Sequence, residues 1–264
     1  MIIHQPEIII KDGHALLWAN IEMAQKRENF PDYLWYRVPE HCAPYLSTQS
    51  DSFLVAALLA GMYYCENIQV RGTTSPLLAY HLDEYQFLLN LRMPKVVSPV
   101  SVQYEHLKPA EGKPTAVGST FSGGVDSLFT VWKHLPQNQP DPNYQVTHGI
   151  FIRGFDILHS ENDHYQQLFS QFTKQASKYN LELIELETNV FSIIHHRMGL
   201  TEFLGPLIIS NALALSRLFQ RFYIPSSDDY YIIEDIAYAS DPLTDGFLST
   251  DTMDIIHHGA TSRR

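Results

Sequence analysis

The stretch AVGSTFSGGVDSLFT, residues 116–130, joins an apolar run to a glycine pair and then to an aspartate and a serine. The apolar run is typical of a buried strand, and the residues from Asp126 onward carry the spacing of an amphipathic helix. Between the two, glycines let backbone N–H groups approach an anion closely, and the start of a helix adds a partial positive charge. The stretch therefore predicts a strand, a phosphate-binding loop and a helix, in that order.

The polar side chains of this loop are suited to a nucleotide that carries a metal ion. Ser122 and Ser127 can donate hydroxyl hydrogen bonds to phosphate oxygens, while Asp126 can cap the helix or orient Mg²⁺. The loop contains no lysine, so it does not match G-x-x-x-x-G-K-[ST], and its adjacent glycines do not match G-x-G-x-x-G. Both patterns are missing, which disfavours P-loop kinase and dehydrogenase functions.

The segment SGGVDS, residues 122–127, resembles the SGGxDS signature of the PP-loop ATP pyrophosphatases, the adenine nucleotide alpha hydrolase-like superfamily. Within it the chain looks nearest to 7-cyano-7-deazaguanine synthase-like proteins, over residues 115 to about 250. The resemblance implies that ATP and Mg²⁺ are bound and that ATP is cut between its α and β phosphates. The residues that it implies for ATP are Ser122, Gly123, Gly124, Val125, Asp126 and Ser127 at the phosphates, Ile150, Phe151 and Ile152 beside the adenine, and Gly205 beside the adenosine. Of these, the resemblance gives Ser122, Asp126 and Ser127 the catalytic role, and Asp126 also the metal.

A regular alternation of strands and helices follows residue 113. Strands are expected at 115–121, 146–153, 181–188 and 222–225, and helices at 126–135, 163–179 and 201–221. This order predicts an α/β fold, a parallel sheet with helices on both faces, in which ligands gather at the carboxyl ends of the strands. The resemblance implies that this part, 113–264, is a HUP-like PP-loop domain.

Residues 1–112 lack that alternation and are expected to form a smaller α+β accessory domain. Strands are expected at 8–10, 15–21 and 33–38, and helices at 52–64 and 75–91. The stretch 108–114 has two prolines, a glycine and three charged residues, so a domain boundary is expected near 112.

Composition limits the partners and the compartment. The formal net charge is −11, and no run of Lys and Arg is longer than the terminal pair, which disfavours nucleic acid as a partner. The N-terminus lacks the features of a signal peptide, and the longest apolar stretch is interrupted by polar residues, so we expect a cytoplasmic protein that spans no membrane. Cys42 and Cys65 are expected to be buried thiols.

Several polar residues near the ends of strands are candidates for substrate contacts, and each has a plain alternative. Arg153 is a candidate for an anionic group and Asp156 for a ribose or metal, with a solvated loop as the alternative. Asn189 is expected to cap a loop and not to face the site. The remaining candidates are Asp241 and Asp245, with Thr244, Ser249 and Thr250, for a second substrate or a metal, and His195, His196, Arg197 and Gly199 at the entrance to a helix. The alternative for both groups is a polar loop, and His257 and His258 are expected to be solvated.

The chain stops at IIHHGATSRR, residues 255–264, which has the pattern of a strand and loop inside a domain. Proteins of the family that it resembles usually continue into a helix and a cysteine-rich zinc motif. We therefore expect a fragment or a shortened relative, incomplete at its C-terminus, and no zinc.

The function expected from these features is adenylylation of a small purine-like or carboxylate substrate by ATP, with release of pyrophosphate. A nitrogen or sulfur donor then displaces AMP. Two alternatives stay open at this point: a tRNA-thiolation-type enzyme, and a non-catalytic ATP-binding module. The resemblance also raises the possibility of a homodimer.

Overall fold

The structure is a computed structural model that describes residues 1–27, 30–155, 157, 159–193, 200–228 and 240–261. Its strands are β1 (Ile2–Ile3), β2 (Glu7–Lys11), β3 (His14–Glu22), β4 (Tyr33–Pro39), β5 (Ile68–Thr74), β6 (Val102–Leu107), β7 (Ala116–Thr120), β8 (His148–Arg153), β9 (Glu182–Thr188), β10 (Phe219–Pro225) and β11 (Asp254–His258). Its α-helices are α1 (Asp51–Tyr64), α2 (Pro76–Arg92), α3 (Val125–Lys133), α4 (Asn162–Ser177) and α5 (Leu200–Ala214), and the 3-10 helices are η1 (Glu40–Tyr45), η2 (Pro142–Tyr144), η3 (Val190–Ile193) and η4 (Asp245–Leu248).

One half of the sheet is a parallel block in the order β9-β8-β7-β10-β11. The chain runs outward from β7 through α3 to β8 and through α4 to β9, then returns through α5 to β10. The direction of the connections therefore reverses between β7 and β10, and at such a point the loops beyond the strand ends separate and leave a crevice.

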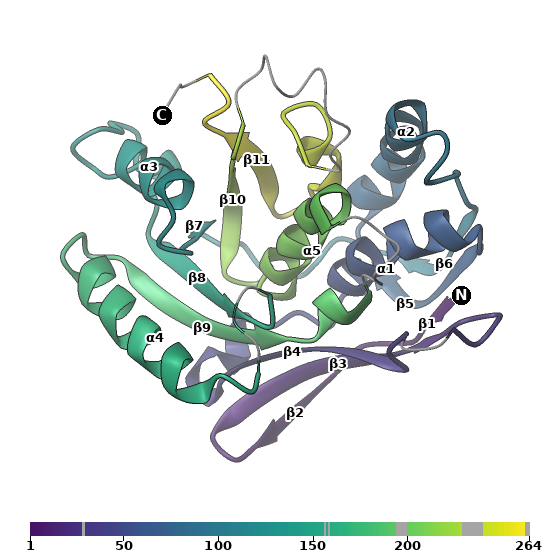
Figure 1. Ribbon diagram of the computed structural model, residues 1–264, viewed down its shortest axis with the longest axis horizontal. Coiled ribbons are helices and arrows are strands. Elements are labelled where there is room, and N and C mark those ends of the chain that lie inside the picture. The colour runs from purple at the N-terminus through teal and green to yellow at the C-terminus, as the bar shows by residue number, and fades with distance from the viewer. Residues whose placement is uncertain (28–29, 156, 158, 194–199, 229–239, 262–264) are drawn as a thin grey trace.

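Helices cover both faces of this block (Figure 1). Neighbouring residues of β7 show the division: Val117 joins a core cluster with Val131 of α3 and Ala176 of α4, whereas Ala116 joins the larger cluster that contains α5. Successive side chains of a strand point to opposite faces, so each strand contributes to both cores. The predicted α/β class, with a mostly parallel central sheet flanked by helices, is confirmed.

The N-terminal part continues the same sheet. Strand β4 pairs antiparallel with β9, with Tyr36 opposite Thr188, and β3, β1, β5 and β6 follow in order. Strand β2 pairs with β3 on the edge away from β4, next to β1. The side chain of Asn189 crosses this junction, because its Nδ2 donates to Tyr33 O at 2.9 Å and its Oδ1 accepts from Trp35 N at 2.9 Å. Asn189 therefore ties β4 to the end of β9, a role that the sequence did not predict.

The large core cluster also extends across the expected boundary near 112. It includes Tyr36 of β4 and Phe53 of α1 together with Phe203 of α5, and α1 packs along α5. Residues 1–112 and 113–264 thus share one sheet and one core, with the segment after β6 connecting them.

Two sequence expectations were wrong in detail. The helix expected at 201–221 ends at Ala214, and β10 already begins at Phe219, so the polar pair Ser216 and Arg217 marks the turn between them and not a position within the helix. Cys65 is exposed, not buried, since it ends α1 in a left-handed conformation with φ 53°. Among the described helices, none has the length and apolar character needed to cross a membrane.

Candidate functional site

A cavity of about 590 Å³ lies at the carboxyl ends of β7, β8 and β10, where the sheet topology predicts a crevice. Ser122, Asp126 and Ser127 of the glycine loop line its polar end. Apolar side chains from β8, α4 and α5 line the remainder, which include Ile150, Ile152, Leu168, Phe172, Leu204 and Ile208. Its volume is within the range of small-molecule sites, and its lining changes from hydroxyl and carboxylate groups to hydrocarbon.

Gly123 has a backbone and a position that only glycine fits. Its φ is +77°, in the left-handed region, and a Cβ atom added to it would lie 2.2 Å from Cζ of Phe172. Gly124 then precedes α3 in an extended conformation, and the helix begins at Val125. The loop is therefore held flat against Phe172 of α4, with the first turn of α3 directly beside it.

The two loop serines are hydrogen-bonded to each other and to the backbone. Ser122 Oγ donates to Ser127 Oγ at 3.2 Å, and Ser127 Oγ donates to Gly124 O at 3.0 Å. Ser127 is buried, while Ser122 is exposed. The Ser122 hydroxyl can consequently turn its proton toward a ligand and give up a single hydrogen bond, whereas Ser127 braces the loop. Val125 is 65% exposed and does not line the cavity.

The three residues predicted to flank an adenine reach the cavity from different directions. Ile150 and Ile152 belong to the face that carries α5. The Phe151 ring points to the opposite face, where it stacks on Tyr165 with ring centroids 5.3 Å apart and meets Phe172 edge-on. All three line the cavity, with Phe151 held in the α4 core and only 4% exposed.

The donor set at the polar end suits a nucleotide-bound Mg²⁺. Mg²⁺ is usually held by one or two carboxylates together with phosphate oxygens and water. Asp126, in the first turn of α3, is the carboxylate that lines the cavity. Over the described ranges, no group of three or more His, Cys, Asp or Glu side chains is arranged to hold a metal by itself. Among the described residues, Asp126 is therefore the carboxylate that could hold a metal in this cavity.

Arg153 was a candidate for binding an anion, but its guanidinium is engaged by other groups of the protein. The side chain is buried, its Nη1 lies 3.3 Å from Glu187 Oε1, and its Nη2 donates to His159 O at 2.7 Å. The guanidinium also covers the ring of Tyr165, 4.6 Å from the centroid. Arg153 thus connects β8 to β9 and the start of α4, and it does not line the cavity. Asp156, like His195, His196, Arg197 and Gly199, lies outside the described residues.

The predicted substrate residue Asp241 is fully buried and pairs with Arg92 of α2. Its Oδ1 also accepts from Leu243 N at 2.6 Å and from Thr244 N at 3.1 Å. Asp241 does not line the cavity of about 590 Å³, and its hydrogen bonds to Leu243 N and Thr244 N stabilise a turn.

Asp245 is also fully buried, and it holds a histidine. Its Oδ2 accepts from Ser240 Oγ at 2.9 Å and lies 2.8 Å from Nδ1 of His257. Burial raises the pKa of the Asp245 carboxyl, and the contact with His257 offsets part of that rise. The expectation that His257 and His258 are solvated was wrong. The His257 side chain is 6% exposed, and His258 packs between Phe129 and His134 on the opposite face of β11.

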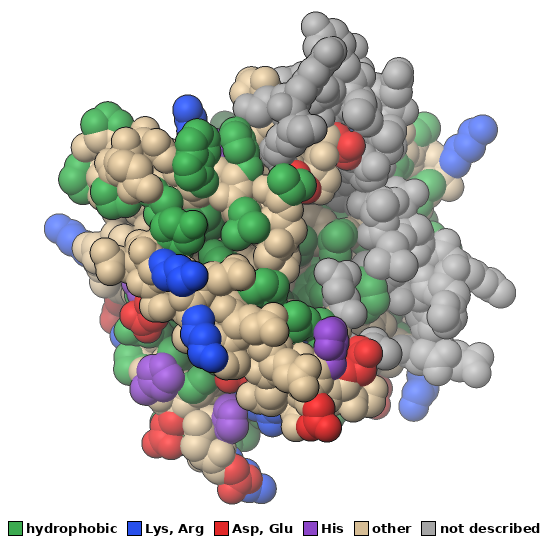
Figure 2. All heavy atoms as spheres, turned by 60° about the vertical axis from the view of Figure 1, so that its left-hand side comes forward, with side chains coloured by type: hydrophobic (Ala, Val, Ile, Leu, Met, Phe, Trp, Pro, Cys, Tyr) green, Lys and Arg blue, Asp and Glu red, His purple; other side chains and the backbone are tan. Residues whose placement is uncertain are grey.

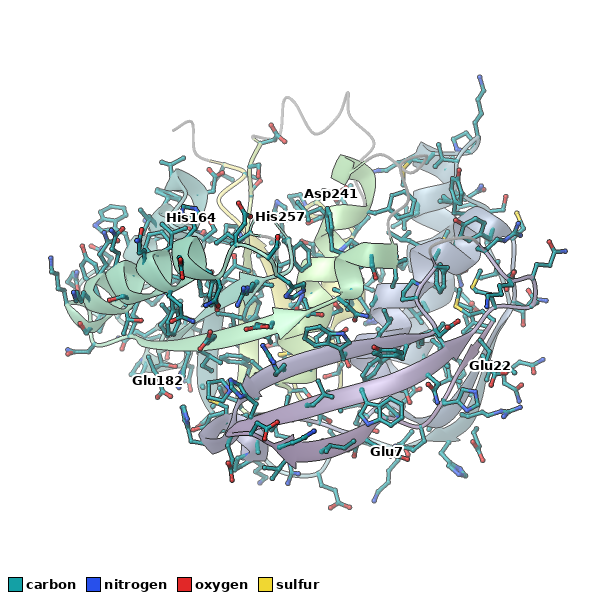
Figure 3. The ribbon with its side chains drawn as sticks, turned by 60° about the horizontal axis from the view of Figure 1, so that its bottom comes forward. Glu7, Glu22, His164, Glu182, Asp241 and His257 are labelled. Atoms are coloured by element: carbon teal, nitrogen blue, oxygen red, sulfur yellow. The ribbon has the colours of Figure 1, made fainter. Side chains whose placement is uncertain are left out.

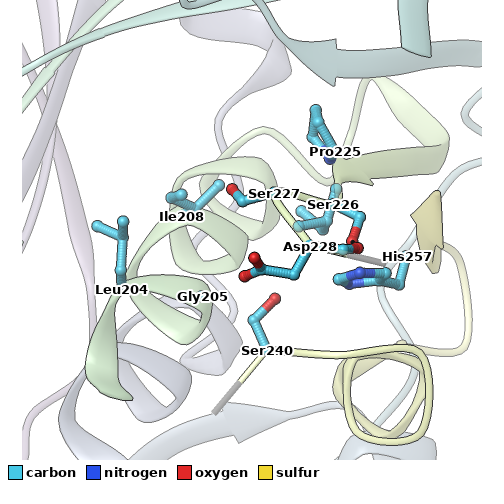
Figure 4. Close-up of a pocket in the computed structure, with 10 residues that line it drawn as sticks. Leu204, Gly205, Ile208, Pro225, Ser226, Ser227, Asp228, Ser240 and His257 are labelled. Atoms are coloured by element: carbon cyan, nitrogen blue, oxygen red, sulfur yellow. Dashed lines mark hydrogen bonds between the residues drawn. The ribbon is translucent and has the colours of Figure 1, made fainter. Parts of the chain in front are cut away.

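A second, smaller cavity of about 160 Å³ adjoins the first (Figure 4). Gly205, Asp228, Ser240 and His257 line it, and Leu204, Ile208, Ile224, Pro225 and Ser227 line both cavities. Gly205 was predicted to lie beside the adenosine. A Cβ atom added to it would lie 2.0 Å from Cβ of Ser240, so the close approach of Ser240 requires a glycine at this position. His164 lines the large cavity and His257 the small one. Figure 3 shows both residues on one side of the molecule, and Glu182, at the start of β9, on the other.

Charge on the surface around the site is mixed. On the face that brings α3 and α4 forward, the described Lys and Arg side chains lie at several separate places, and most acidic ones lie toward the lower edge of the view (Figure 2). No Lys or Arg lines either cavity within the part of the chain that the structure describes. Among the described residues, the N-terminus of α3 and the backbone N–H groups of the loop supply positive potential for an anion.

Comparison with known proteins returned no match to any family model, any curated protein or any solved structure.

Proposed function

We propose that this chain is an ATP pyrophosphatase that transfers AMP to an oxygen atom of a small purine-like or carboxylate substrate, after which a nitrogen or sulfur nucleophile displaces AMP. The supporting observation is the meeting of the SGGVDS loop with the end of β8 around one cavity of about 590 Å³. A loop of this kind at the carboxyl edge of a parallel sheet favours a nucleotide whose phosphates lie at the start of α3.

In this proposal the loop supplies electrostatic stabilisation and no nucleophile. The substrate oxygen attacks the α phosphorus, the bond to the oxygen that bridges the α and β phosphates breaks, and pyrophosphate leaves with the negative charge that develops. Ser122, the backbone around Gly123 and Gly124, and the first turn of α3 hold that charge. Asp126 would hold Mg²⁺, which supplies further charge neutralisation when it is bound.

The apolar wall gives the remaining recognition. Ile150 and Ile152 lie on the α5 side of the cavity and Phe172 on the α4 side, so a flat heterocycle can enter between two hydrocarbon surfaces. The second substrate then approaches from the side of α5 and β10, where the smaller cavity adjoins.

The test is chromatographic identification of nucleotide products. The protein is incubated with Mg-ATP, with ammonium or sulfide, and with a panel of purine and deazapurine carboxylic acids. AMP and pyrophosphate that depend on one panel member would support the proposal. ADP and phosphate would refute it, and intact ATP throughout would favour a module that binds ATP without turnover.

A matched pair of variants separates the role of the site from the general effect of a charge at the start of a helix. Asp126→Asn removes the cavity carboxylate, and we expect product formation to fall about a hundredfold or more. Asp163→Asn removes an exposed acid in the first turn of α4, and we expect it to leave the rate unchanged. Equal losses in the two variants would contradict the site assignment.

A further inference from the structure

His257 is built so that one nitrogen of its ring is fixed and the other is without a partner. Nδ1 lies 2.8 Å from Oδ2 of Asp245, which also accepts from Ser240 Oγ. We therefore assign a proton to Nδ1, which in the neutral imidazole leaves the lone pair on Nε2. Nε2 is buried and, within the described structure, has no hydrogen-bond partner. A buried polar atom without a partner costs free energy, so this arrangement calls for a donor from a ligand.

The other polar groups around the small cavity are also acceptors or hydroxyls. His257 lines the cavity together with Asp228, Ser227 and Ser240, and Figure 4 shows Asp228, Ser240 and His257 around the same hollow. The Ser240 proton is used at Asp245, because Ser240 Oγ donates to its Oδ2. A carboxylate and an imidazole lone pair together favour a ligand that is positively charged and rich in N–H donors.

We propose that the cavity of about 160 Å³ binds ammonium or the protonated primary amine of a small molecule, with an N–H group donating to Nε2 of His257 and the charge balanced by Asp228. Asp245 is a positioning residue, since it touches His257 and lies outside the cavity lining. The cavity has room for an ammonium ion or for the amine end of a larger molecule that extends into the large cavity.

The position of this cavity, next to the large one, would allow the bound nitrogen to act as a nucleophile. It shares Ile208, Ile224 and Ser227 with the large cavity, so a nitrogen held by His257 lies next to the place where an adenylylated substrate would form. An ammonium ion becomes a nucleophile only after it loses a proton, and Nε2 can accept that proton. The new C–N bond then forms as the C–O bond to AMP breaks. This reactive step rests on the proposed function, whereas the binding of ammonium does not. A site for ammonium favours a nitrogen donor over a sulfur donor.

Binding is tested without nucleotide, by NMR of the histidine side chains. Protein labelled with ¹⁵N-histidine is titrated at constant pH and ionic strength with ammonium, methylammonium, tetramethylammonium or potassium chloride, and His257→Gln identifies the signal. We expect ammonium or methylammonium to move the Nε2 resonance of His257 saturably, and tetramethylammonium and potassium, which have no N–H group, to leave it unmoved. Stronger binding of ammonium would point to the free ion, and equal or stronger binding of methylammonium to an amine on a larger substrate.

Two variants complete the test. Asp228→Asn leaves the buried residues intact and should weaken ammonium binding about tenfold. His258→Gln alters the neighbouring ring on the other face of β11 and should leave binding unchanged. An unmoved Nε2 resonance, or equal shifts with tetramethylammonium, would overturn the inference even if AMP and pyrophosphate form. Conversely, ammonium binding without any turnover of ATP would leave the inference standing and reject the proposed function.

Discussion

Gly123 combines two constraints that a single substitution can separate. Its φ of +77° strains any other residue, and Phe172 occupies the space where a Cβ atom would lie. Gly13 has nearly the same φ, +74°, but nothing lies within 4 Å of its Cβ position. Gly13→Ala should therefore cost about 1 kcal/mol of unfolding free energy, and Gly123→Ala about 3 kcal/mol, because overpacking adds to the backbone strain.

Urea unfolding measures the loss of unfolding free energy in both glycine variants, and binding of a fluorescent ATP analogue measures whether the loop still holds a nucleotide. Phe172→Leu in the Gly123→Ala background should restore part of the lost stability, because it removes the ring that a Cβ atom meets. Equal costs for the two glycine variants would show that the contact with Phe172 carries no strain.

Asp51 predicts how stability depends on pH. Burial raises the pKa of its carboxyl to about 7, and the hydrogen bond from Ser75 N only partly opposes the rise. In the unfolded chain this pKa is near its usual value of about 4. Between those two values the folded protein binds one proton more than the unfolded chain, so this group makes the free energy of unfolding fall as pH rises from about 4 to about 7, and not above.

Urea unfolding at a series of pH values checks this, with Asp51→Asn expected to remove that part of the slope. Asp163→Asn, an exposed acid in the corresponding turn of α4, is expected to keep the slope of the parent protein. A slope that survives in Asp51→Asn would assign the effect to other groups.

At the scale of elements, the end of α2 is fixed to the turn before η4 by an ion pair whose carboxylate is buried and whose guanidinium is partly exposed. Arg92 lies in the last turn of α2, and its partner Asp241 is fully buried. Arg92→Met should destabilise the protein by about 3 kcal/mol, because it leaves a buried charge without its partner. Arg92→Met with Asp241→Asn should cost less than Arg92→Met alone, since the remaining amide needs no counter-charge.

Calorimetric unfolding measures this pair, and Lys95→Met is the control. Lys95 is exposed just beyond α2, and its loss should change stability by no more than about 0.5 kcal/mol. If the double variant were the less stable of the two, the ion pair would not be the source of the loss.

The sequence was most informative where an element has a strong local pattern. Strands β7, β8 and β9 and helices α3 and α4 fall close to their expected ranges, because apolar periodicity and the glycine pair mark their limits. Strands β1, β5 and β6 were not predicted, since β1 has two residues and β6 is mostly exposed. Their pairing depends on partners that are distant in sequence.

The candidate site shows the same division. The loop residues were predicted from local sequence and those at the end of β8 from the family resemblance, and both groups lie around one cavity. The pair Asp245 and His257 was not predicted as a pair, because its members come from a 3-10 helix and a strand that meet only in the folded chain. The usable signal was the alternation of adjacent residues on a strand, which places His257 and His258 on opposite faces.

For the whole molecule, the junction between β4 and β9 predicts cooperative unfolding. The two strands pair with Tyr36 opposite Thr188, and the Arg37–Glu187 ion pair joins them. The side chain of Asn189 adds two hydrogen bonds to backbone groups of β4. We expect backbone amides of β4 and β9 to exchange their hydrogens with the same free energy of opening, measured by native-state hydrogen exchange. Asn189→Ala should lower both together by about 2 kcal/mol. Earlier opening of β4 alone would indicate two independently stable units.

The same junction has a consequence for how the chain is made. Arg37 pairs with a residue 150 positions later in the sequence, so β4 leaves the ribosome long before β9 exists. At about 5 to 20 residues per second, the edge of β4 that awaits β9 stays unpaired for about 8 to 30 seconds of synthesis. An unpaired strand edge is a template for pairing with other chains. During this interval a chaperone would have to cover the edge of β4 that β9 covers in the folded protein. Slowing translation between β4 and β9 should therefore lower the yield of folded protein, whereas slowing it after β9 should not.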